Sequence, residues 1–117
     1  MGKLSATLLC TLALTMAAYA TVPNFAEMPQ SIASAKTADD HRRFGDYFAS
    51  KAASYDAEAA AHEKMAASYA IRSSGGRNDM SSMRSHCISL RDGFLNAARD
   101  ARALEQAHRH QVQMLGG

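Results

Sequence analysis

A ladder of rings organises the centre of the chain. A ring stands at every seventh position, and a glycine or alanine follows each of the first four rings after four residues. Side chains seven and four residues apart share one face of an α-helix. The pattern predicts a long helix over residues 38–72 that packs closely against another helix through this ring ladder: His41, Phe48, Tyr55, His62 and Tyr69, with Gly45, Ala52, Ala59 and Ala66 between them.

Local signals mark both ends of this first helix. Thr37 suits the N-cap, and Asp40 occupies the capping-box position three residues later. After residue 72 the chain reads Ser-Ser-Gly-Gly, in which Gly75 or Gly76 suits the left-handed position that ends many helices. We therefore expect a turn over residues 73–78.

A second helix is predicted over residues 79–113, with Asn78 or Asp79 as its cap. A short turn makes two long helices antiparallel neighbours, so the expected fold is all-α: a long, coiled-coil-like, two-helix hairpin. The expected opposite pairs are Tyr69 with Met83, His62 with Leu90, Tyr55 with Ala97, and Phe48 with Leu104. The inward column of the second helix is predicted to be Met83, Cys87, Leu90, Phe94, Ala97, Ala101, Leu104 and His108.

Two helices alone bury only one seam and cannot enclose a core of independent stability. Ile88 and Leu95, seven residues apart, lie on a predicted face that turns away from that seam. An exposed aliphatic face can mark a second contact surface. We expect two hairpins to associate into a four-helix bundle; the alternative is a single hairpin with its leader folded back.

The first 20 residues resemble a secretory signal peptide. Lys3 precedes the uncharged run Leu4–Ala18, and Ala18-Tyr19-Ala20 supplies the small residues of a cleavage site. The run is short for a transmembrane helix, which needs roughly 20 apolar residues; an uncleaved N-terminal anchor is the alternative. Residues 21–37, which contain both prolines, then form an expected flexible leader with at most a short helical turn.

The interspersed charges of the chain argue against two classes of partner, nucleic acids and membranes. Without residues 1–20 the chain has twelve Lys and Arg against eleven Asp and Glu, and the two signs are interspersed. A nucleic-acid-binding face would show clustered basic residues, and a polybasic membrane anchor would do the same. We expect no nucleic acid partner and no membrane insertion of the mature chain.

Cleavage of the signal peptide removes Cys10 and leaves Cys87 as a single cysteine. Exported proteins usually pair their cysteines, because their compartment is oxidising. Three alternatives follow for Cys87: it is buried and inert, it forms a disulfide with a second chain, or it binds a ligand.

A possible metal site lies near the closed end of the hairpin. Imidazole, thioether and thiolate groups are ligands that copper or zinc accepts. However, His86 and Cys87 are adjacent and point about 100° apart on a helix, so packing explains the same residues equally well. The candidate ligands are His62, Met65, Met83, His86 and Cys87.

A second possible metal site lies at the open end, where His41 is expected to approach His108 and His110. Histidines at a solvated helix end that interact with the helix dipole are the alternative interpretation. No phosphate-binding loop, paired-carboxylate cleft or haem-attachment motif is present, and a two-helix seam offers no substrate pocket. We expect no enzyme activity and no catalytic residues. We also expect no cofactor, with bound copper or zinc as the alternative.

Residues 44–109 resemble small exported, alanine-rich helical-hairpin proteins of proteobacteria. The resemblance rests on Tyr55, His62-Glu63-x-Met65-Ala66, a glycine-rich turn, and His86-Cys87-x-x-Leu90 followed by alanines and His108-Arg109. Gly93, Ile88 and Leu95 depart from the pattern. The resemblance implies a periplasmic or outer-envelope location and transfers no activity and no ligand residues.

These observations predict a non-enzymatic, periplasmic or secreted helical hairpin with a structural or protein-interaction role in the cell envelope. Its expected partner is a second copy or another envelope protein. The alternative function is a small periplasmic protein that binds copper or zinc through the His, Cys and Met residues near the closed end.

Overall fold

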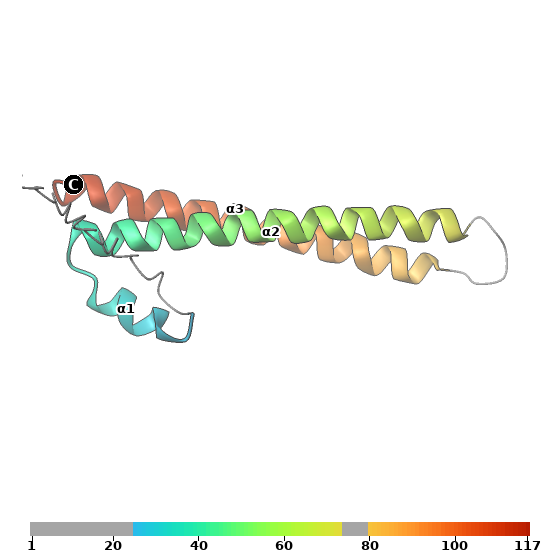
Figure 1. Cartoon of the computed structure of the whole chain (residues 1–117), viewed down its shortest axis with the longest axis horizontal. Helices are drawn as coiled ribbons and strands as arrows, with labels where there is room; N and C mark the ends of the chain where they lie inside the picture. The colour runs from blue at the N-terminus through green and yellow to red at the C-terminus, as the bar shows by residue number, and fades with distance from the viewer. Residues whose placement is uncertain (1–24, 74–79) are drawn as a thin grey trace, which may run out of the picture.

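The computed structural model describes residues 25–73 and 80–117, and these residues form an all-helical hairpin (Figure 1). A 3-10 helix, Phe25–Glu27, leads into α1, Met28–Ser34; α2 is Ala38–Ser73 and α3 is Ser81–Met114. The two long helices have 36 and 34 residues and run antiparallel, as predicted. None of the described helices is long and apolar enough to cross a membrane.

Several sequence predictions fall outside the described residues. These are the signal peptide over residues 1–20, the two glycines of the turn, and Asn78 and Asp79 as caps. The residue at the N-cap of α3 is Met80, whose side chain makes no capping hydrogen bond; its carbonyl oxygen accepts from the Arg84 amide at 3.0 Å.

The predicted capping box at the start of α2 is confirmed. The Asp40 amide donates to Thr37 Oγ1 at 3.1 Å, and Asp40 Oδ2 accepts from the Thr37 amide at 3.0 Å. The same oxygen also accepts from the Lys36 amide at 3.0 Å. These bonds, led by that from Lys36, hold the pKa of Asp40 well below its usual value because they favour the charged carboxylate.

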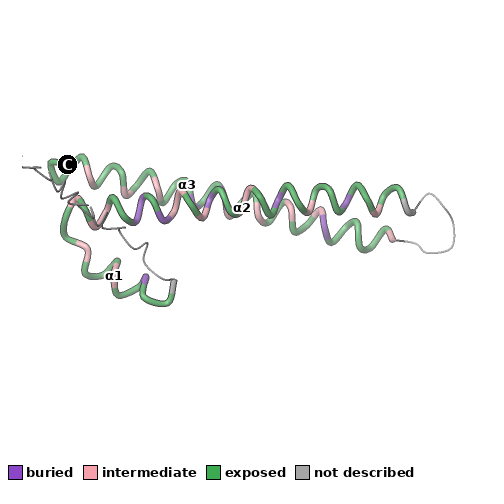
Figure 2. The backbone as a smooth tube through the Cα atoms, in the orientation of Figure 1, coloured by how far each residue is buried: buried purple, intermediate pink, exposed green. Residues whose placement is uncertain are grey.

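The ring ladder is the face of α2 that packs against α3. All five rings are half-buried, while Gly45, Ala52, Ala59 and Ala66 are buried (Figure 2). The small residues let the two helices approach, and the rings fill the space beside them. The predicted packing face is confirmed for His41, Phe48, Tyr55 and His62, whose rings lie against His108 or Phe94 of α3.

The predicted inward column of α3 is wrong for three residues. Met83, Leu90 and Leu104 are 50%, 48% and 46% exposed, whereas Ala98, which was not assigned to the seam, is fully buried. The rings of α2 already fill the seam, so α3 must present small residues where the helices are closest. The observed inward column includes Cys87, Phe94, Ala98, Ala101 and His108.

The pairing across the hairpin differs accordingly from the predicted one. Phe94 lies between two rungs of the ladder, with its ring 6.2 Å from that of Tyr55 and 5.5 Å from that of His62. The predicted partner of His62 was Leu90, one turn away. The overall antiparallel alignment holds, but α3 is rotated about its axis relative to the expectation.

Exposed ion pairs connect the flanks of the two helices. Arg91 bonds Glu63 at 2.6 Å, Arg102 bonds Asp56, and Arg109 contacts Asp46 at 3.4 Å. The hydrogen bond to Glu63, followed by that to Asp92, raises the pKa of Arg91. Such exposed pairs are weak because water and salt screen them, so they favour this alignment without dominating the stability.

The described part of the leader is more helical than expected. Pro29 lies in the first turn of α1, where proline's missing N–H is tolerated. Met28 is buried against Phe44 and Tyr47, which form a small core cluster at the open end of the hairpin. The leader is therefore attached to α2 through Met28, with Ala35 packed against the same cluster.

Candidate functional site

The closed-end residues proposed as metal ligands lie on different sides of the hairpin. His62 packs in the seam with its ring stacked on Phe94 at an interplanar angle of 12°, and its Nδ1 is buried without a hydrogen-bond partner. Cys87 is a buried free thiol, whereas its neighbour His86 is exposed. To form a disulfide with a second chain, Cys87 would have to leave the seam.

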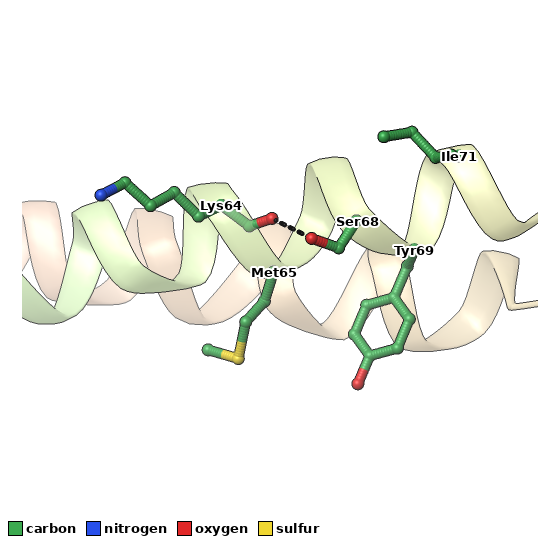
Figure 3. A pocket seen from close by; sticks show the side chains of 5 residues that line it. All are labelled: Lys64, Met65, Ser68, Tyr69 and Ile71. Atoms are coloured by element: carbon green, nitrogen blue, oxygen red, sulfur yellow. Dashed lines mark hydrogen bonds between the residues drawn. The ribbon is translucent and has the colours of Figure 1, made fainter.

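The two methionines of the same candidate site are exposed. Met65 projects on the same side of α2 as Tyr69, and Ile71 points to the opposite side (Figure 3). An open hollow of about 510 Å³ lies here, lined by α2 alone: Lys64, Met65, Ser68, Tyr69 and Ile71. Ser68 Oγ donates to the Lys64 carbonyl at 3.0 Å, so this hydroxyl already has a partner within the helix. Because side chains of α2 alone line this hollow, it is an open feature of the surface and does not enclose a ligand.

Within residues 25–73 and 80–117, no group of three or more His, Cys, Asp and Glu side chains is arranged to hold a metal ion. His86 and Cys87 diverge, as their adjacency on a helix requires. The metal site of His62, Met65, Met83, His86 and Cys87 stays a prediction, without an assembled ligand set.

At the open end, the structure brings His41 and His108 together. Their Nδ1 atoms are 2.9 Å apart, and the ring centroids are separated by 5.2 Å. His41 is in the first turns of α2 and His108 is near the end of α3, so the contact joins the two ends of the hairpin. The expected approach of His41 to His108 is confirmed, whereas His110 is exposed.

Aromatic side chains surround the two imidazoles. The Phe48 ring stacks on His108 at 5.6 Å with an interplanar angle of 9°, and Phe44 packs against His108 at 5.1 Å and against His41 edge-on at 6.4 Å. Burial, and secondarily the charge of His41, lowers the pKa of His108. The neutral imidazole is the form that accepts hydrogen bonds and ligates metals.

An apolar groove of about 330 Å³ lies between α2 and α3, next to α1. Tyr47, whose hydroxyl is buried without a hydrogen-bond partner, is one of its walls. Sequence analysis missed Tyr47 and Phe44 because they lie outside the seven-residue ladder; the spacing Phe44-x-x-Tyr47-Phe48 was the available signal for a second apolar face. The groove is lined by Met28, Tyr47, Phe48, Lys51, Tyr55, Ala97, Asp100, Ala101 and Leu104.

Comparison of the chain with protein-family models, with curated proteins and with solved structures finds no match. Inferences about function therefore rest on the geometry of the hairpin itself.

Proposed function

We propose that the protein is a non-enzymatic structural or interaction protein of the cell envelope, and that its hairpin pairs with a second copy to form a four-helix bundle. The observation that carries this proposal is a column of apolar side chains on α3 that the hairpin leaves uncovered. Met83, Leu90, Ala97 and Leu104 recur every seven residues on one side of the helix. We call this column the apolar flank.

The apolar flank extends from a groove that is already present between α2 and α3. Its last two members, Ala97 and Leu104, line the groove that Met28 of α1 also lines. The three larger members, Met83, Leu90 and Leu104, remain about half exposed. Exposed apolar side chains in a continuous column favour a protein partner, because association removes their surface from water.

The spacing on the apolar flank suits a second copy of the same chain. Leu90 and Leu104 are equally distant from Ala97, so a two-fold axis at Ala97 would place Leu90 of each copy against Leu104 of its partner. A symmetric dimer needs such a self-complementary surface.

Gly93 also favours close packing of a second helix against α3 near the apolar flank. It lies in the middle of α3, where glycine costs roughly 1 kcal/mol relative to alanine. A Cβ added at Gly93 would meet nothing within 4 Å, so no contact within the hairpin requires glycine. A second helix packed closely over this turn would supply a reason for it.

Sedimentation of the purified protein tests the bundle. We expect a dimer that Leu90→Glu and Leu104→Glu each convert to a monomer, because each substitution would bury a charge at the interface. Leu95→Glu is the matched control, since Leu95 is equally exposed at 45% on another side of α3. Circular dichroism would verify that all three variants keep their helices. A monomeric wild-type protein would contradict the bundle. A Leu95→Glu variant that dissociates as readily would contradict the apolar flank as its interface and favour the face with Ile88 and Leu95 that the sequence predicts.

The envelope location rests on the N-terminal sequence and is tested separately. We expect the chain to be recovered from the periplasmic or secreted fraction with Thr21 as its first residue. Retention of residues 1–20 would favour the N-terminal anchor.

A further inference from the structure

We propose that His41 and His108 form a two-histidine site for a divalent first-row metal ion such as Zn²⁺ or Cu²⁺. The observation is their head-on arrangement, with Nδ1 atoms 2.9 Å apart across the open end of the hairpin. The site would connect the start of α2 to the end of α3. It does not depend on the association of two hairpins.

The separation of the two nitrogens suits shared coordination. Two nitrogens each about 2.0–2.1 Å from one metal ion lie about 2.9 Å apart when their bonds meet at a right angle, and roughly 3.3 Å apart at the tetrahedral angle. The observed 2.9 Å therefore requires rotation of the rings to aim both lone pairs at one ion, and little change in separation. Water would complete the coordination shell.

The surroundings hold the imidazoles ready to bind. The stack of Phe48 on His108 and the packing of the buried Phe44 ring against both imidazoles keep the two rings close together. Prior ordering of this kind reduces the entropy lost on binding. Burial lowers the pKa of His108, which favours the neutral imidazole, the form that ligates metals.

Metal binding at both Nδ1 atoms requires one imidazole to change its tautomer. In the metal-free pair, the nitrogen of one neutral ring donates its Nδ1 proton to the Nδ1 lone pair of the other. For both Nδ1 atoms to bind metal, the donating ring must adopt the tautomer that carries its proton on Nε2, and that proton transfer occurs through solvent.

Calorimetric titration of tag-free protein with ZnCl₂ and with CuCl₂ tests the site. We expect one ion per chain, tighter binding of Cu²⁺ than of Zn²⁺, and a melting temperature that rises with metal concentration. His41→Gln and His108→Phe should each weaken binding by about tenfold or more. His108→Phe keeps an aromatic ring against Phe48 while it removes the ligand.

His110→Gln and His86→Gln are the matched controls, because both side chains are exposed histidines of α3 outside the pair. They should leave the affinity unchanged. Equal losses in these controls, or an affinity unchanged by His41→Gln and His108→Phe, would overturn the proposal, as would absence of binding to both metals.

NMR of the wild-type protein keeps the test independent of how the variants fold. Two-bond ¹H–¹⁵N spectra should show Zn²⁺-dependent shifts of the His41 and His108 Nδ1 resonances, with His110 unmoved. Shifts confined to His110 or His86 would contradict the assignment.

Discussion

His62 lies flat against Phe94, with ring centroids 5.5 Å apart and an interplanar angle of 12°. This contact gives His62 a packing role equivalent to that of the other rungs of the ring ladder. Its buried Nδ1, however, has no hydrogen-bond partner among the described residues. A buried polar atom without a partner costs about 1–3 kcal/mol.

We therefore expect His62→Phe to stabilise the hairpin, by about 1 kcal/mol, since it keeps the stack and removes the unpaired nitrogen. Chemical denaturation followed by circular dichroism measures the change. His62→Ala is the comparison and should destabilise, because it removes the ring that covers Phe94. Destabilisation by His62→Phe would indicate that the imidazole nitrogen has a partner, such as a metal ion or a water molecule.

Ala98 offers a test of close helix approach. It is fully buried at the seam, so a larger side chain there must push α2 and α3 apart. We expect Ala98→Leu to lower the free energy of unfolding by about 1–3 kcal/mol. Ala103→Leu, at an exposed position of the same helix, should change it by less than about 0.5 kcal/mol. Similar effects of the two substitutions would contradict the observed rotation of α3.

The two glycines inside the long helices should respond differently to alanine. Gly93→Ala should stabilise the dilute, monomeric hairpin by about 1 kcal/mol, because the added methyl group meets nothing within 4 Å. Gly45→Ala should gain less, since its Cβ would lie 3.4 Å from Arg109 Cγ, at the close limit of van der Waals contact. Thermal melts at low protein concentration measure both, and a larger gain at Gly45 would refute the close passage of Arg109.

The capping box predicts an acid-sensitive helix start. The folded-state pKa of Asp40 is lowered from its ordinary value of 3.8, first by the hydrogen bond from the Lys36 amide. A lowered pKa contributes stability that is fully present above the unfolded-state value and is lost as the pH falls towards the folded-state value.

We expect the difference in melting temperature between wild type and Asp40→Asn to shrink as the pH falls from about 6 to about 3. Comparing the two proteins cancels the titration of the other carboxylates. Asp39→Asn is the control, because Asp39 lies one residue away and makes no hydrogen bond to the backbone N–H groups that Asp40 accepts from. A difference independent of pH would show that the charge of Asp40 does not stabilise α2.

Part of the candidate metal chemistry was predictable from residue spacing. Antiparallel helices of known length bring His41 to His108, and the structure places their nitrogens 2.9 Å apart. The stack of Phe48 on His108 was not predicted, since the expected partner of Phe48 was Leu104. It depends on the rotation of α3, which no local signal in that helix specifies.

The sequence alone determined the two long helices, the capping box and the packing face of α2, because a ring every seven residues with a small residue between leaves one possible face. It did not determine the packing face of α3. There the column with Leu90 and Leu104 is more apolar than the column with Ala98 and Ala101, yet the second column is buried. Only the tertiary structure decided this, because the rings of α2 occupy the seam and close packing favours small partners over hydrophobic ones. The attachment of α1 through Met28 was decided in the same way, by a surface that exists only after the hairpin forms.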